Sequence, residues 1–120
     1  MELLREDRDG AAIIRYQGAR LDAASAIRFK DRFRDLIDGE TQRYILDLSE
    51  VDFMDSSGLG AVVAVFKLLG EKHALDLAAL TPAVDRVFRL TRMDSVFRIF
   101  QTIEEAQGLA ASGTAAHAPA

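Results

Sequence analysis

The chain has 120 residues, 49% of them hydrophobic and 28% charged, and its formal net charge is −4. This length suits one globular domain, and the acidic balance disfavours nucleic acid and anionic membranes as partners. The sequence has no cysteine, which rules out disulfides and thiolate chemistry, and its two histidines, His73 and His117, are too few and too far apart to indicate a metal site.

The chain begins with an acidic segment, Met1 to Asp7, that lacks the cationic start and apolar core of a signal peptide. We therefore expect a cytoplasmic location. Two short strands are predicted at residues 3–4 and 11–16, because Asp9-Gly10 between them is a dipeptide typical of hairpin turns.

The first predicted helix runs from about Ala23 to Asp38, with Asp22 as its N-cap and Gly39 just past its end. Apolar residues at helical spacing give this helix one buried side. Ile27 lies off that side. Since it is close in sequence to Asp22, it is a candidate for the same surface.

Strands and helices alternate through the second half of the chain. A strand at 44–48 leads through a loop to Asp55 and then to an apolar helix that ends near Leu69. The remaining predicted elements are a strand at 75–80, a helix opened by Thr81-Pro82, an edge strand at 96–100, and a short helix opened by the capping box Thr102 to Glu105. Little beyond Gly108 can be buried, so we predict a domain at 1–110 and a flexible tail at 111–120.

This order of elements predicts an α/β fold: one domain with a mixed, mostly parallel sheet of about five strands and helices packed on it. In such sheets the functional loops follow the carboxyl ends of the strands. Asp22 and the turn Asp55-Ser56-Ser57 each follow a strand and precede a helix. We therefore expect them to share one rim of the sheet, which is the candidate functional surface.

The turn before the apolar helix has a chemistry of its own. The first backbone N–H groups of a helix lack partners, and the helix dipole favours negative charge there, so a phosphate on Ser56 would be stabilised. Asp55, Ser56 and Ser57 could also be a plain helix cap, a common use of these residue types, and their spacing alone favours that role. Gly58-Leu59-Gly60 lacks the rest of a dinucleotide fingerprint, and we expect no cofactor.

The strongest motif in the chain is Phe53-Met54-Asp55-Ser56-Ser57-Gly58-Leu59-Gly60. It resembles the signature of the STAS domain, in the form carried by bacterial anti-sigma factor antagonists (anti-anti-sigma factors). The resemblance covers about residues 3–108 and includes Thr81-Pro82-Ala83-Val84 with Phe88 beyond it.

The chain departs from the family pattern at two places. Gly18 and Asp22 are separated by one residue more than the pattern has, which bears on the equivalence of Asp22. The segment Thr91-Arg92-Met93-Asp94 replaces a more usual small-residue turn, with no evident consequence.

The resemblance implies a phosphorylation switch. In that family the first serine after the aspartate, here Ser56, is phosphorylated by an anti-sigma factor that is itself a serine kinase with an ATP-binding kinase fold. The unphosphorylated antagonist binds this kinase and frees a sigma factor, phosphorylation blocks the binding, and a PP2C-type phosphatase resets the serine. Asp22 corresponds to an acidic residue near the kinase contact. With the neighbouring rim residues, the predicted partner-binding set is Asp22, Ile27, Met54, Asp55, Ser56, Ser57, Gly58 and Leu59.

Two other functions compete with this one. The first is an accessory STAS subunit of a membrane lipid ABC transporter, in which Ser56 is dispensable. The second is an enzyme with Ser56 as nucleophile, which is the weakest because the chain has no Gly-x-Ser-x-Gly elbow and no convincing histidine base. We expect no enzyme activity, no nucleic-acid partner and no membrane insertion, since the apolar helix is shorter than the roughly 20 residues that span a bilayer.

Overall fold

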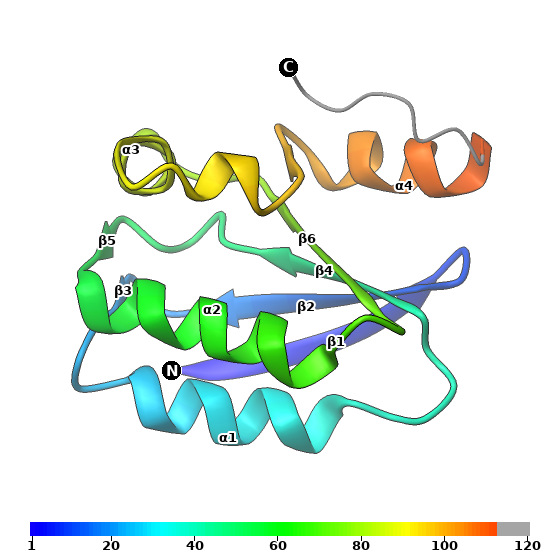
Figure 1. Ribbon diagram of the computed structural model, residues 1–120, viewed down its shortest axis with the longest axis horizontal. Helices are drawn as coiled ribbons and strands as arrows, with labels where there is room; N and C mark the ends of the chain where they lie inside the picture. Colours follow the sequence, from blue (N-terminus) through cyan, green and yellow to red (C-terminus); the bar gives the residue numbers. More distant parts are fainter. Residues whose placement is uncertain (113–120) are drawn as a thin grey trace.

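A five-stranded sheet with helices on both faces forms the centre of the computed structural model, which describes residues 1–112 (Figure 1). The strand order is β1-β2-β4-β6-β7, with β1 antiparallel to β2 and the later neighbours parallel. The sheet consists of β1 (Glu2–Arg8), β2 (Ala11–Gln17), β4 (Arg43–Asp47), β6 (Ala74–Ala78) and β7 (Ile99–Phe100). The helices are α1 (Ala26–Leu36), α2 (Ser56–Leu69), α3 (Pro82–Leu90), a 3-10 turn η1 (Met93–Ser95) and α4 (Ile103–Ser112). The predicted α/β fold with a mixed, mostly parallel sheet of about five strands is confirmed.

The opening hairpin forms at the predicted dipeptide. Asp9 has φ 50° and Gly10 has φ 81°, so both turn residues adopt the left-handed conformation that a two-residue hairpin of the primed type requires. The turn sets the register of the two strands, in which Arg8 faces Ala11.

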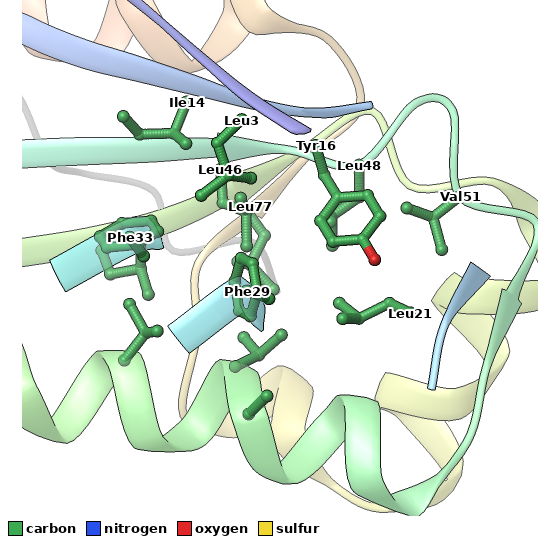
Figure 2. Packing of buried hydrophobic residues seen from close by; sticks show 14 of the residues in the cluster. Leu3, Ile14, Tyr16, Leu21, Phe29, Phe33, Leu46, Leu48, Val51 and Leu77 are labelled. Carbon is green, nitrogen blue, oxygen red and sulfur yellow. The ribbon is translucent and has the colours of Figure 1, made fainter. Parts of the chain in front are cut away.

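Alternation along the strands divides the apolar residues into two layers. The larger layer lies between the sheet and the helices α1 and α2, where Ile14, Leu46 and Leu77 from three adjacent strands pack with Phe29 and Phe33 of α1 (Figure 2). The smaller layer lies under α4 and consists of Ala11, Ile13, Ile45, Ala78, Phe100 and Ala106.

Most apolar side chains of helix α2 pack against other elements of the domain. It packs on the sheet and alongside α1. On a further side, the Phe66 ring lies 5.0 Å from that of Phe97, which in turn lies 5.8 Å from Phe88 of α3. Leu68 remains exposed. Neighbouring elements thus account for most of the apolar surface of this helix.

Several predicted boundaries are wrong, most clearly those of the first helix and of the last strand. Helix α1 begins at Ala26 rather than Ala23, because the preceding residues form a turn in which the Ala26 N–H donates to the Asp22 carbonyl at 2.8 Å. The same helix ends at Leu36, before Gly39. The predicted edge strand at 96–100 is reduced to β7, because Phe97 is buried in the larger core instead of continuing the strand.

Two short strands were not predicted. These are β3 (Arg20–Leu21) and β5 (Phe53–Met54), which pair in parallel to form a separate two-stranded sheet. Two residues are too few to show a strand period, so the pattern gave no signal.

Helix α4 starts at the predicted capping box. The Thr102 hydroxyl accepts from the Glu105 N–H at 3.0 Å, while the Glu105 carboxylate accepts from the Gln101 N–H at 3.3 Å, one residue before the expected donor. The helix runs to Ser112, past Gly108, where fraying was expected. The predicted flexible tail, 111–120, shares its first two residues with α4, and the rest of it lies outside the described residues.

Candidate functional site

The pairing of β3 with β5 brings Asp22 close to the turn Asp55-Ser56-Ser57, the two segments that were predicted to share one rim. Arg20 faces Phe53 and Leu21 faces Met54 in a parallel register, so Asp22 and Asp55 both follow the end of this small sheet. The Ala23 N–H donates to the Asp55 carboxylate at 3.3 Å, which joins the two loops directly. Figure 1 shows β3 and β5 beside the first turn of α2. The predicted common rim is present, although the small sheet that forms it was not predicted.

Asp55 is the N-cap of α2. Its backbone is extended, with φ −104° and ψ −174°, and its Oδ1 accepts from the Gly58 N–H at 2.9 Å. The other oxygen, Oδ2, accepts from Ala23. A single carboxylate therefore caps the helix and holds the Asp22 loop against it.

Ser56 and Ser57 are the first two residues of α2, and both side chains are exposed. Their backbone N–H groups belong to the first turn, where the helix offers donors and a partial positive charge. Ser56 is thus accessible to an enzyme that would modify it, at a position that favours an added negative charge.

Gly58 makes the close contact between α2 and β3 possible. A Cβ at this position would lie 2.0 Å from the Leu21 carbonyl oxygen and 2.7 Å from its carbon, so any side chain would collide with backbone. Leu21 itself is fully buried in the core (Figure 2). Gly58 therefore determines how closely the Ser56 turn approaches the Asp22 loop.

Asp22 does not cap α1 as predicted. The residue at the N-cap of that helix is Ser25. Asp22 instead stabilises the turn before the helix: its Oδ1 accepts from the Ala24 N–H at 3.1 Å, and its Oδ2 accepts from Arg20 Nε at 3.0 Å. The hydrogen bond from Arg20 holds the pKa of the Asp22 carboxyl below its ordinary value, so this group is ionised at neutral pH.

The other residues of the predicted binding set divide into exposed and buried groups. Ile27 is 68% exposed, as single large apolar side chains on protein surfaces commonly are. Leu59 is partly buried, whereas Met54 and Gly58 are buried. Met54 and Gly58 thus lie beneath the rim, whose exposed residues are Ser56 and Ser57, while Asp22 is partly buried.

Two residues of this surface were missed by sequence reasoning. Phe53, which was named only as part of the signature motif, is partly exposed, and the guanidinium of Arg20 lies 4.0 Å from the centroid of its ring. Their contact follows from the β3–β5 register. Only a prediction of that pairing would have revealed it.

In the described part of the chain, neither a metal-ligand cluster nor a histidine lies at Ser56. Within residues 1–112, no group of three or more His, Cys, Asp or Glu side chains could hold a metal ion. His73 follows the opposite end of α2, where its Nδ1 lies 2.8 Å from the Leu69 carbonyl oxygen. A helix of this length separates it from Ser56 by about 20 Å, so it does not serve as a base for that hydroxyl. His117 lies outside the described residues.

None of the helices in the described part of the chain is both long enough and apolar enough to cross a bilayer.

Comparison with known proteins identifies the family. The STAS domain model matches residues 3–106. BtrV of Bordetella bronchiseptica, assigned as an anti-sigma factor antagonist, is 31% identical over 107 residues, which cover 88% of this chain and 91% of that protein. The anti-sigma-B factor antagonist of Listeria monocytogenes is 30% identical over 104 residues, covering 86% of this chain and 91% of that protein.

A solved structure agrees with this assignment. The crystal structure of an anti-sigma factor antagonist from Mycobacterium paratuberculosis superposes with a TM-score of 0.81 at 27% identity, covering 91% of this chain and 92% of that chain. The signature predicted from the sequence lies inside the matched region, and its residues Asp55, Ser56 and Ser57 form one part of the rim described above. The chain belongs to the STAS domain family, and within it to the anti-sigma factor antagonists.

Proposed function

We propose that this protein antagonises an anti-sigma factor: its unphosphorylated form binds a serine-kinase anti-sigma factor through the rim, and phosphorylation of Ser56 blocks that binding. The observation that carries the proposal is the exposed hydroxyl of Ser56 at the N-terminus of α2, joined to the Asp22 loop through Asp55. The names of the relatives support the general role, since they are antagonists of anti-sigma factors.

The physical basis of the switch is the charge of the phosphate. Phosphorylation adds about −1.5 to −2 charges at neutral pH. A partner that buries Ser56 would then have to desolvate this charge beside the carboxylates of Asp55 and Asp22. Burial of an unpaired ion typically costs several kcal/mol, compared with a total of about 8 kcal/mol for a micromolar complex. The added charge is therefore large enough to dissociate the partner.

The proposed partners follow from this switch. The anti-sigma factor carries the ATP-binding kinase fold and modifies Ser56 within the complex. A PP2C-type phosphatase removes the phosphate and restores binding. The proposed location is the cytoplasm, where sigma factors act.

The first experiment uses wild type, Ser56→Ala and Ser56→Asp as baits in a native lysate, with the captured proteins identified by mass spectrometry. We expect wild type and Ser56→Ala to retain a kinase-fold anti-sigma factor, and Ser56→Asp to bind it at least about a hundredfold more weakly. Incubation of that partner with ATP should phosphorylate wild type and Ser57→Ala, but not Ser56→Ala. Ser57→Ala is the matched control, because Ser57 is also exposed and lies in the same helical turn.

Other outcomes separate the competing functions. Retention of one set of transporter subunits by all three baits would indicate the accessory-subunit function, with Ser56 acting only in the helix start. Equal binding of the anti-sigma factor by wild type and Ser56→Asp would contradict the charge mechanism while leaving the partner in place.

A further inference from the structure

Arg20 is held at the edge of the rim by two contacts of different kinds. Its guanidinium lies 4.0 Å from the centroid of the Phe53 ring, and its Nε donates to Asp22 Oδ2 at 3.0 Å. The strand pairing accounts for the first contact, because Arg20 and Phe53 are register partners in β3 and β5, whereas the second joins residues two apart in the sequence. A long, flexible side chain is thereby restricted to one orientation, as guanidinium groups stacked on aromatic rings commonly are.

Because Arg20 is held in one orientation, its hydrogen bond also fixes the orientation of the Asp22 carboxylate. The Asp22 side chain is only 16% exposed, whereas that of Arg20 is 59% exposed. Both carboxylate oxygens of Asp22 are engaged, Oδ2 by Arg20 and Oδ1 by the Ala24 N–H and the Ser25 hydroxyl. Without Arg20, one oxygen would lose its donor and the carboxylate could rotate.

We infer that Arg20 is a positioning residue for partner binding: stacked on Phe53, it holds the Asp22 carboxylate in the orientation that the anti-sigma factor recognises. This inference rests on the proposed function, since it takes Asp22 as a partner contact. Arg20 acts through Asp22 rather than by touching the partner. The effect of removing it should therefore depend on Asp22 being present.

A double-mutant cycle tests this dependence. The probe is the anti-sigma factor captured by wild type, and its dissociation constant is measured for wild type, Arg20→Gln, Asp22→Asn and the double variant. We expect Arg20→Gln to weaken the complex about fivefold to tenfold, and to have less than about a twofold effect when Asp22 is already Asn. Arg20→Lys should fall between wild type and Arg20→Gln, because it keeps the charge but loses the planar contact with Phe53.

A second measurement needs no partner. Carboxyl carbon NMR of the free protein reports the pKa of Asp22, which should rise in Arg20→Gln because the donor that favours the ionised form is gone. The other ionisable groups near Asp22 are Asp55, joined to the same loop through the Ala23 N–H, and Tyr16, whose hydroxyl donates to the Arg20 carbonyl. Neither is altered by the substitution.

Arg34→Gln is the matched control. Arg34 is 61% exposed and forms an ion pair with Asp31 in the last turn of α1. This variant removes the same charge from a similarly exposed position and should leave the dissociation constant and the Asp22 pKa unchanged. Equal unfolding midpoints for wild type and Arg20→Gln would show that the fold is intact.

Three results would overturn the inference. If Arg20→Gln weakens the complex by the same factor in the wild-type background and in Asp22→Asn, Arg20 contacts the partner directly. An unchanged dissociation constant in Arg20→Gln would mean that it has no part in binding. Capture of no anti-sigma factor by wild type would overturn the proposed function itself, and the inference with it.

Discussion

Gly58 shows how a single residue sets the geometry of the rim. A side chain there would collide with the backbone of Leu21, so α2 would have to move away from β3. We expect Gly58→Ala to lower the free energy of unfolding by about 1–3 kcal/mol, the usual cost of overpacking, and to weaken partner binding because the Ser56 turn moves with the helix. Urea unfolding and the dissociation constant of the anti-sigma factor complex measure the two effects.

Gly60 provides the control for this prediction within the same helix. It is exposed, and no atom lies within 4 Å of a Cβ placed there. Gly60→Ala should leave stability unchanged or raise it by up to about 1 kcal/mol, since alanine favours helix. Equal stabilities of the two variants would contradict the close approach of α2 to β3.

At the scale of elements, the regular strands and helices could be predicted because their residues repeat with a period. The signature turn was predicted from its hydroxyl and carboxyl residues, and Asp55 caps α2 as those residue types suggest. The small sheet of β3 and β5 could not be predicted, because two residues show no alternation. The contact of Arg20 with Phe53 depends on that pairing, and it escaped prediction for the same reason.

The ion-pair network beneath α4 was also beyond prediction from local pattern. Asp76, in β6, accepts from Arg43 of β4 at 2.7 Å and from Arg98 at 2.9 and 2.8 Å. These arginines are 33 and 22 residues away in sequence. Alternation places Asp76 on the face of β6 opposite Leu75 and Leu77. A buried carboxylate requires partners, but the local pattern does not tell which ones.

Because of this network, we expect Asp76→Asn to lower the free energy of unfolding and to loosen the packing of α4 on the sheet. Asp76→Asn would leave Arg43, which is only 12% exposed, without a counter-charge, and such losses cost about 3–5 kcal/mol. Arg43 also donates to the Ala106 carbonyl at 2.8 Å, so the amides of α4 should exchange hydrogen faster in this variant. Chemical unfolding and hydrogen exchange measure the two changes.

Arg98→Gln is the comparison within the network. The Arg98 side chain is 34% exposed, so water can replace part of what it loses. Its effect on stability should be clearly smaller than that of Asp76→Asn. Equal effects of the two substitutions would mean that the charge of Asp76 is not what holds Arg43 in place.

At the scale of the whole molecule, the rim and the α4 network occupy separate places. The rim follows the small sheet at the start of α2, whereas the network lies on the face of the main sheet that α4 covers. Between them lies the larger core, which includes fully buried Tyr16, Leu21 and Val51 (Figure 2). Ser56 is exposed and belongs to neither the larger core nor the ion-pair network, so a charge added to it falls at the solvent-facing start of α2.

We accordingly expect phosphorylation of Ser56 to abolish binding without changing the fold. The helix N-terminus offsets part of the repulsion between the phosphate and Asp55, so the free energy of unfolding should change by less than about 1 kcal/mol. Amide NMR shifts should change around residues 20–25 and 53–60 and remain constant in β6 and α4. Chemical-shift changes that spread into β6 and α4 would contradict a purely local switch. They would mean that phosphorylation changes the conformation of the sheet, and the partner could then be released by that change. If binding is lost and the NMR shifts change only around residues 20–25 and 53–60, the charge on Ser56 itself is what prevents the partner from binding.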